Sequence, residues 1–314
     1  MPSRTSANAV ARLLALGAAA TLRAPAVRAQ TIDDGFLFPK HQLRAGAEYG
    51  RDQWSQYWEG GLQRANDNIG TVTTRSLVGT AGYGATDRLS VFATLPYVWT
   101  RASEGVLHGL SGRQDLTLAA KYRVAGAMLA GRARLGAFAT AGVGVPTSNY
   151  TVDFMPMSIG SGSRRAFGRA VLHLQDRAGW YVEGAAGHTW RSNVRLDRPA
   201  YYTDGHLYST DEVEMPDVAD YTAAAGYQRG RVCVPLALVT QRTLGGGDIR
   251  RQDMPFVSNR MNFTQLRAHA MYDLRVPSSV ILDLGVMHTL SGRNVGRSTA
   301  LTGGFAYAFG RPGF

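Results

Sequence analysis

The sequence predicts an all-β fold, an antiparallel up-and-down transmembrane β-barrel of about 12 strands that follows a cleaved signal peptide. Three observations predict it: an apolar leader with basic residues, a repeated alternation of apolar and polar residues, and aromatic residues at the ends of the apolar faces. The chain has 314 residues, 45% of them apolar and 18% charged, which favours a folded chain over a disordered one.

Residues 1–29 have the three parts of a secretory signal peptide. Arg4 and Arg12 form the basic start, residues 13–22 form an apolar stretch, and Val27-Arg28-Ala29 offers small residues for cleavage. The apolar stretch is too short for a membrane helix, which needs about 20 apolar residues. We therefore expect the chain to be exported and cleaved near Ala29.

The strands are predicted from period-two alternation, which recurs along the rest of the chain. In residues 89–101, for example, Leu89, Val91 and Tyr97 share one face, whereas Ser90 and Thr94 lie on the other. The same pattern gives twelve segments in all, at residues 41–49, 70–83, 89–101, 114–123, 133–145, 165–175, 180–191, 217–228, 231–242, 262–275, 280–290 and 299–309.

The links between these segments alternate between short turns and long loops. Short turns are predicted at residues 84–88, 176–179, 229–230 and 276–279, and long loops at residues 50–68, 146–163, 191–216 and 243–260. Tight turns at one end and long loops at the other are typical of outer-membrane barrels.

Aromatic and charged residues distinguish the barrel from a secreted soluble sandwich, the alternative all-β fold. The following aromatic residues share parity with the aliphatic face of their own segment: Tyr49, Tyr83, Tyr97, Trp99, Tyr122, Trp180, Trp190, Tyr221, Tyr227, Tyr272, Tyr307 and Phe309. Such residues suit the depth of lipid headgroups. The opposite faces carry charges that a dry sandwich core would not accept, so they indicate a hydrated lumen.

Composition excludes several other classes of protein. Cys233 is the single cysteine, which excludes an intrachain disulfide and the paired thiolates of structural zinc sites. The net charge is +11, but four arginines lie in residues 1–29, which hold no acid, so 11 minus 4 leaves +7. We expect no nucleic acid partner, because the chain is exported.

Parity places a set of charged and histidine side chains in the lumen. The candidates are Arg44, Glu48, Lys121, Arg123, Arg169, His173, Glu183, Arg267, His269, Asp273 and Asp283. Counted with other inward groups, seven cations face six acids, which predicts paired ions instead of a ring of one sign. Twelve strands also predict a narrower barrel than the 16–18 strands of open porins.

The two ends of the mature chain have separate predicted roles. Residues 30–40, which include Asp33, Asp34 and Phe36-Leu37-Phe38, form either an N-terminal periplasmic segment or a plug that folds into the barrel. The barrel itself is assigned to residues 41–314. The alternating last strand, with Phe309 or Phe314 as its terminal aromatic, resembles the signal that barrel-assembly machinery reads.

Enzymatic and metal chemistry are weakly indicated. A lipid hydrolase needs a serine and histidine about 3 Å apart, yet His188 and Ser192 lie four strand residues apart, about 13 Å, and His288 and Ser291 point to opposite faces. No two histidine or acidic residues have a metal-ligand spacing within one strand, even though His173, His269, Glu183 and Asp273 face inward. We therefore predict no catalytic residue, no metal and no cofactor.

Residues 83–123 resemble a known outer-membrane family. The resemblance lies in residues 83–91, in Leu95-Pro96-Tyr97 and in residues 112–123, which form a strand, an aspartate turn, a strand ending in Leu-Pro-Tyr and a segment opening at Asp115-Leu116. This pattern is similar to that of the transporter-like family named for the MetA pathway of phenol degradation. Gln114 stands where that family has glycine.

The resemblance implies an outer-membrane barrel of a Gram-negative bacterium that passes small, apolar or aromatic molecules. Its expected partners are the lipid bilayer, the assembly machinery and these solutes. The alternatives are a structural or adhesive barrel without transport and, with less support, the membrane-embedded lipid hydrolase.

Overall fold

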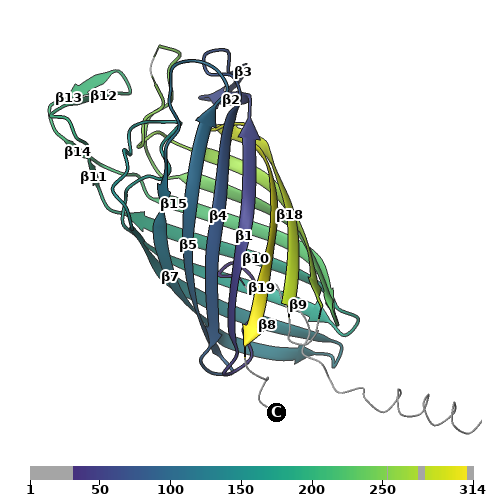
Figure 1. The fold of residues 1–314 in the computed structure, drawn as a ribbon. Coiled ribbons are helices and arrows are strands. Elements are labelled where there is room, and N and C mark those ends of the chain that lie inside the picture. The colour runs from purple at the N-terminus through teal and green to yellow at the C-terminus, as the bar shows by residue number, and fades with distance from the viewer. Residues whose placement is uncertain (1–30, 253, 275–279, 310–314) are drawn as a thin grey trace, which may run out of the picture.

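The computed structural model describes residues 31–252, 254–274 and 280–309. Over these residues the chain forms a closed antiparallel barrel (Figure 1). The twelve long strands of its wall are β1 (Leu43–Trp54), β4 (Val72–Gly84), β5 (Leu89–Ala102), β7 (Asp115–Leu129), β8 (Ala133–Pro146), β9 (Arg165–Asp176), β10 (Trp180–Arg191), β15 (Val218–Arg229), β16 (Val232–Thr243), β17 (Asn262–Asp273), β18 (Val280–Arg293) and β19 (Thr299–Phe309).

The barrel closes because β1 pairs antiparallel with both β4 and β19. Tyr49 lies opposite Leu77 on one side and Gly303 on the other. Each long strand from β4 to β18 pairs with the long strands before and after it in the chain, so the connectivity is up-and-down. This confirms the predicted fold class. The predicted signal peptide at residues 1–29, the turn at residues 276–279 and Phe314 lie outside the described residues.

The two ends of the barrel differ as the sequence predicts. At the turn end, β9 and β10 are joined through Gly179 and β15 and β16 through Gly230, and both glycines have positive φ. At the loop end, the long connections contain short strands (Figure 1). These are β2 (Gln56–Glu59), β3 (Leu62–Ala65), β6 (Ser111–Arg113), β11 (Val194–Arg195), β12 (Tyr201–Thr203), β13 (His206–Tyr208) and β14 (Glu212–Val213).

Two strands, β1 and β7, extend furthest beyond the segments that the alternation predicts. β1 continues to Trp54, where backbone pairing with β4 and β19 persists beyond the alternating side chains. β7 continues to Leu129 past a register shift between Arg123 and Ala125. Such a bulge inserts a residue and reverses the parity of the side chains after it, so a strict period-two template ends there.

Side chains sort between the two faces of the wall. The outer face is apolar, with Leu284 67% exposed, Trp180 62% exposed and Tyr49 47% exposed. Large exposed apolar surfaces of this kind indicate contact with lipid. The inner face holds buried polar groups, including Ser90 and Lys121, each 0% exposed. No helix among the described residues is long and apolar enough to cross a bilayer.

We predict that Leu238→Arg prevents assembly whereas Val239→Arg does not. The residues are adjacent in β16, but Leu238 is an exposed outer-face residue and Val239 lines the lumen. An arginine facing lipid at the bilayer midplane costs about 2–4 kcal/mol, whereas the lumen is hydrated. Heat-modifiability on gels and recovery in the membrane fraction measure assembly. Assembly of Leu238→Arg together with failure of Val239→Arg would mean that the faces are assigned backwards.

Candidate functional site

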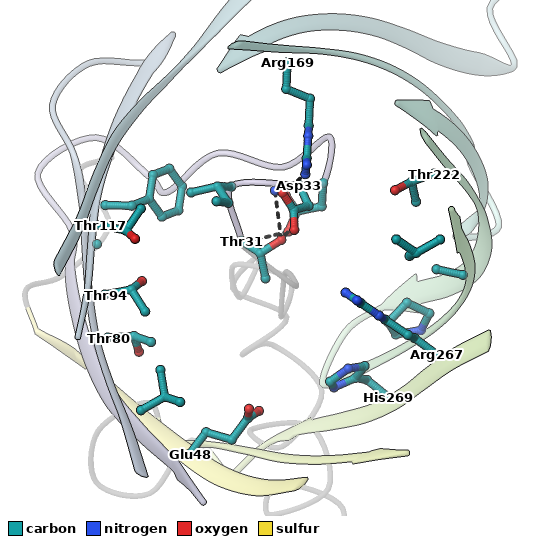
Figure 2. Close-up of a pocket in the computed structure, with 18 of the residues that line it drawn as sticks. Thr31, Asp33, Glu48, Thr80, Thr94, Thr117, Arg169, Thr222, Arg267 and His269 are labelled. Atoms are coloured by element: carbon teal, nitrogen blue, oxygen red, sulfur yellow. Dashed lines mark hydrogen bonds and ion pairs between the residues drawn. The ribbon is translucent and has the colours of Figure 1, made fainter. Parts of the chain in front are cut away.

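The lumen contains a cavity of about 770 Å³, lined by residues from most strands of the wall. Figure 2 shows that its two sides differ in chemistry. Thr80, Thr94 and Thr117 lie on one side, whereas Arg267 and His269 project from the other. A row of three threonine hydroxyls therefore lies across the cavity from Arg267 and His269, on whose side Thr222 also lies.

Seven of the eleven candidate lumen residues line this cavity: Arg44, Glu48, Arg169, Glu183, Arg267, His269 and Asp283. The remaining candidates lie outside its lining. Arg123 donates to the Asp87 carbonyl in a turn, at 3.1 Å. Asp273 is buried, and its backbone amide donates to Arg231 O. Lys121 and His173 contact residues 31–38, which cover them.

The ionisable groups of the cavity form separate small clusters. Arg169 forms ion pairs with Asp220 of β15 and with Asp33. His269 Nδ1 lies 3.2 Å from an Asp283 oxygen. Arg267 instead donates to Gln265 Oε1, at 2.8 Å, so its partner there is a neutral amide.

Residues 31–35 are held against the inner wall by polar contacts. Lys121 Nζ donates to Thr31 O at 2.5 Å and to Asp34 Oδ1 at 2.8 Å, and it is fully buried. The backbone N–H of Gly35 donates to Glu183 Oε2 at 2.6 Å. Burial of a lone ammonium group would be costly. Lys121 can be buried because the aspartate and the backbone carbonyls accept its hydrogen bonds.

Residues 36–38 are held by three separate apolar clusters. Phe36 packs with Tyr181, Cys233 and Ile281, Leu37 with Phe138 and Val171, and Phe38 with Phe92 and Ala119. All three residues are nearly fully buried, at 4–6% exposure. Gly82 provides room for the Phe38 ring, because a Cβ there would lie 2.1 Å from Phe38 Cε2.

His173 of β9 points from the wall towards this segment. Its Nδ1 is 2.9 Å from Glu183 Oε2, and its ring is 4.6 Å from that of Phe36. Glu183 therefore accepts from Gly35 and contacts His173 at the same oxygen. Sequence parity indicates that both side chains point inward, but it gives no sign that a segment from before the first strand lies against them.

The residues considered for a lipid hydrolase do not form a nucleophile and base. His188 Nε2 lies 3.2 Å from Asp217 Oδ2. Ser192 Oγ accepts from the Arg164 backbone and donates to Asn193 O. His288 contacts Thr299 at 2.8 Å. These three side chains therefore hydrogen-bond to groups other than a serine–histidine partner.

The loop between β8 and β9 is attached to the wall through Asp115, which opens the Asp115-Leu116 segment. The Tyr150 hydroxyl donates to Asp115 Oδ1 at 2.8 Å, and Arg165 lies 3.4 Å from Asp115 Oδ2. Burial, followed by the neighbouring Asp115 carboxylate, raises the pKa of Tyr150, so this phenol stays protonated as a donor. The contact holds to the wall a loop whose Ser161 and Ser163 line the cavity.

Comparison with known proteins supports the fold. No protein-family model and no curated protein matches the chain. A solved outer membrane channel from Pseudomonas putida F1 is similar, with 18% identity over 90% of this chain and 100% of that chain and a TM-score of 0.69.

Weaker likenesses exist to two further solved structures. The translocator domain of the autotransporter NalP from Neisseria meningitidis has 11% identity over 98% of this chain and 96% of that chain, with a TM-score of 0.44. The CymD monoaromatic hydrocarbon channel has 10% identity over 87% and 90%, with a TM-score of 0.39. The strand order and the likeness to the Pseudomonas putida channel define the fold as an up-and-down β-barrel of the outer-membrane type.

We predict that Lys121→Ala releases residues 31–38 from the wall. Removing one partner of a buried ion pair costs about 3–5 kcal/mol, because the other charge stays buried and unpaired. Chymotrypsin should then cleave after Phe36 much faster than in the wild type, whereas the Phe38-Pro39 bond resists this protease. Arg123→Ala is the control, since Arg123 is in the same strand but contacts a turn. Unchanged protection in Lys121→Ala would show that the apolar contacts alone hold the segment.

Proposed function

We propose that the mature chain lies in the outer membrane of a Gram-negative bacterium, where its lumen passes small apolar or aromatic molecules. The observation that carries this proposal is the cavity inside a closed barrel whose outer face is apolar. Its volume of about 770 Å³ falls within the range of about 300–1,000 Å³ that is typical of small-molecule sites. Cleavage of the predicted signal peptide near Ala29 belongs to the same proposal.

The cavity lining favours uncharged solutes of modest size. Phe92, Phe167 and Phe263 contribute rings to it, and Val78 and Val239 contribute aliphatic groups. The hydroxyls of Thr80 and Thr94, on the same strands as Val78 and Phe92, offer hydrogen bonds to a phenolic or similar polar group. Apolar walls with a few polar groups are usual in sites for such molecules.

Residues 31–40 serve, in this proposal, as a plug that narrows the turn end of the lumen. Support comes from the Lys121 and Glu183 contacts and from the burial of residues 36–38 inside the wall. The segment joins β1 directly, with the His41 amide donating to Gly84 O at 2.7 Å. Solutes would pass beside the segment or after it moves.

Membership of the MetA-pathway family is the finer part of the proposal. The resembling residues 83–123 form the end of β4, a turn, β5, β6 and the start of β7. Within them, Asp115 attaches the β8–β9 loop through Tyr150 and Arg165. Recognition by the assembly machinery through β19, which ends at Phe309, is proposed on the same basis.

We expect liposomes that contain the purified protein to take up small aromatic compounds faster than empty liposomes do. Deleting residues 30–40 should raise the rate severalfold, because the turn end of the lumen is then open. Uptake is followed by fluorescence of the entrapped compound. A rate equal to that of empty liposomes would favour the structural or adhesive alternative, whereas release of fatty acid that Ser192→Ala abolishes would favour the hydrolase.

We also expect weak selectivity among ions, because the cavity is lined by five arginines and six carboxylates. Arg267→Glu should shift the reversal potential in a salt gradient towards cation selectivity, since it replaces a lumen cation with an anion. Arg123→Glu makes the same substitution outside the cavity and should leave the potential unchanged. Equal shifts in both variants would contradict the assignment of the conduction path to this cavity.

A further inference from the structure

Three potential metal ligands from three strands converge on the wall of the lumen. Glu48 of β1, His269 of β17 and Asp283 of β18 each offer one ligand atom, and these atoms all lie within 4.8 Å of one another. His269 Nδ1 is 3.2 Å from Asp283 Oδ1 and 3.3 Å from Oδ2. Figure 2 shows Glu48 and His269 directed into the cavity.

The strand register explains why residues so distant in the sequence meet. Gly304 of β19 pairs with Glu48 on one side and with Asp283 on the other, so these three positions form one row across the wall. Gly285 of β18 pairs with His269 and with Thr302, which forms the next row. The three ligands therefore lie at the corners of a small patch of the inner wall.

Glycines form the floor of this patch. A Cβ on Gly285 would lie 2.8 Å from His269 Nδ1 and 2.5 Å from the Thr302 hydroxyl. A Cβ on Gly304 would lie 3.0 Å from Glu48 Cβ. Larger residues at either position would push the ligands apart, so the absence of side chains there is what lets the imidazole and the two carboxylates approach one another.

The ligand set identifies the class of ion. One imidazole and two carboxylates suit divalent first-row transition metals, whereas magnesium and calcium prefer oxygen ligands alone. Zinc binds histidine nitrogen and carboxylate oxygen at about 2.0–2.2 Å, so two of its ligands lie at most about 4.4 Å apart. Ligand atoms within 4.8 Å of one another need only a small side-chain rotation to reach this geometry.

The nearest cation on the same strand has an amide partner. Arg267 faces the lumen two residues before His269, and a guanidinium there would repel a metal ion. Its Nε and Nη2 both donate to Gln265 Oε1, at 3.3 and 2.8 Å. This contact anchors the guanidinium to the residue of β17 that lies on the far side of Arg267 from His269.

We propose that Glu48, His269 and Asp283 bind one divalent first-row transition-metal ion in the lumen, with Zn²⁺ as the natural probe. Three protein ligands leave at least one coordination position facing the cavity, where water or an oxygen-bearing solute binds. The neutral imidazole and both carboxylates supply two negative charges, which match the charge of the ion. The site stands whether or not the barrel conducts solutes.

Isothermal titration of the refolded protein, without an affinity tag, with Zn²⁺ tests this site. We expect one ion per chain for the wild type. His269→Ala and Glu48→Gln should each weaken binding at least tenfold, because each removes one of three ligands. A heat-modifiability gel verifies that both variants are folded, and Glu48→Gln keeps the size of the side chain if His269→Ala does not fold.

His188→Ala is the matched control, because His188 also contacts an aspartate, Asp217, at 3.2 Å but has no third ligand. It should bind Zn²⁺ as the wild type does. With Co²⁺ in place of Zn²⁺, the visible absorption of a site with a nitrogen ligand should appear in the wild type and His188→Ala and be absent from His269→Ala.

Two results would overturn the proposal. One is the absence of stoichiometric Zn²⁺ binding to the folded wild type. The other is binding that His269→Ala and Glu48→Gln leave unchanged, which would place the ion on other surface groups.

Discussion

The pairing of β1 with both β4 and β19 is the constraint on which the rest of the molecule depends. In a bilayer, an unpaired strand edge would leave backbone N–H and C=O groups without hydrogen bonds, and each such group costs several kcal/mol. Closure pairs these groups all round the wall, so the outer face is free to be mostly apolar. The enclosed volume in turn makes charged side chains tolerable, since water and opposite charges replace lipid around them.

The alternation of side chains predicts the wall well. A strand with lipid on one side and a lumen on the other needs apolar residues on the first face and accepts polar residues on the second. Leu238 and Val239 show its limit, since both are apolar and only parity separates them. The pattern fails where the strand register shifts, as at the bulge after Arg123. It also fails where backbone pairing continues without alternation, as in β1 beyond Tyr49.

The groupings inside the lumen were less accessible to prediction. Period-two parity shows that Glu48, His269 and Asp283 face inward, but their meeting depends on the register between β1, β19, β18 and β17. Ligand spacing within one strand is no guide to such a cluster. The same applies to Arg267, whose partner Gln265 is a neutral residue that a count of charges passes over.

The burial of Phe36, Leu37 and Phe38 in three different clusters has a consequence for the order of assembly. The three clusters include residues of β5, β7, β8, β9, β10, β16 and β18, so the segment's binding site does not exist until most of the wall has formed. The segment is tethered to β1, the strand that meets β19 when the ring closes. Filling of the lumen and completion of the ring are therefore linked steps, and a chain that closes with the segment outside must admit it through an open end.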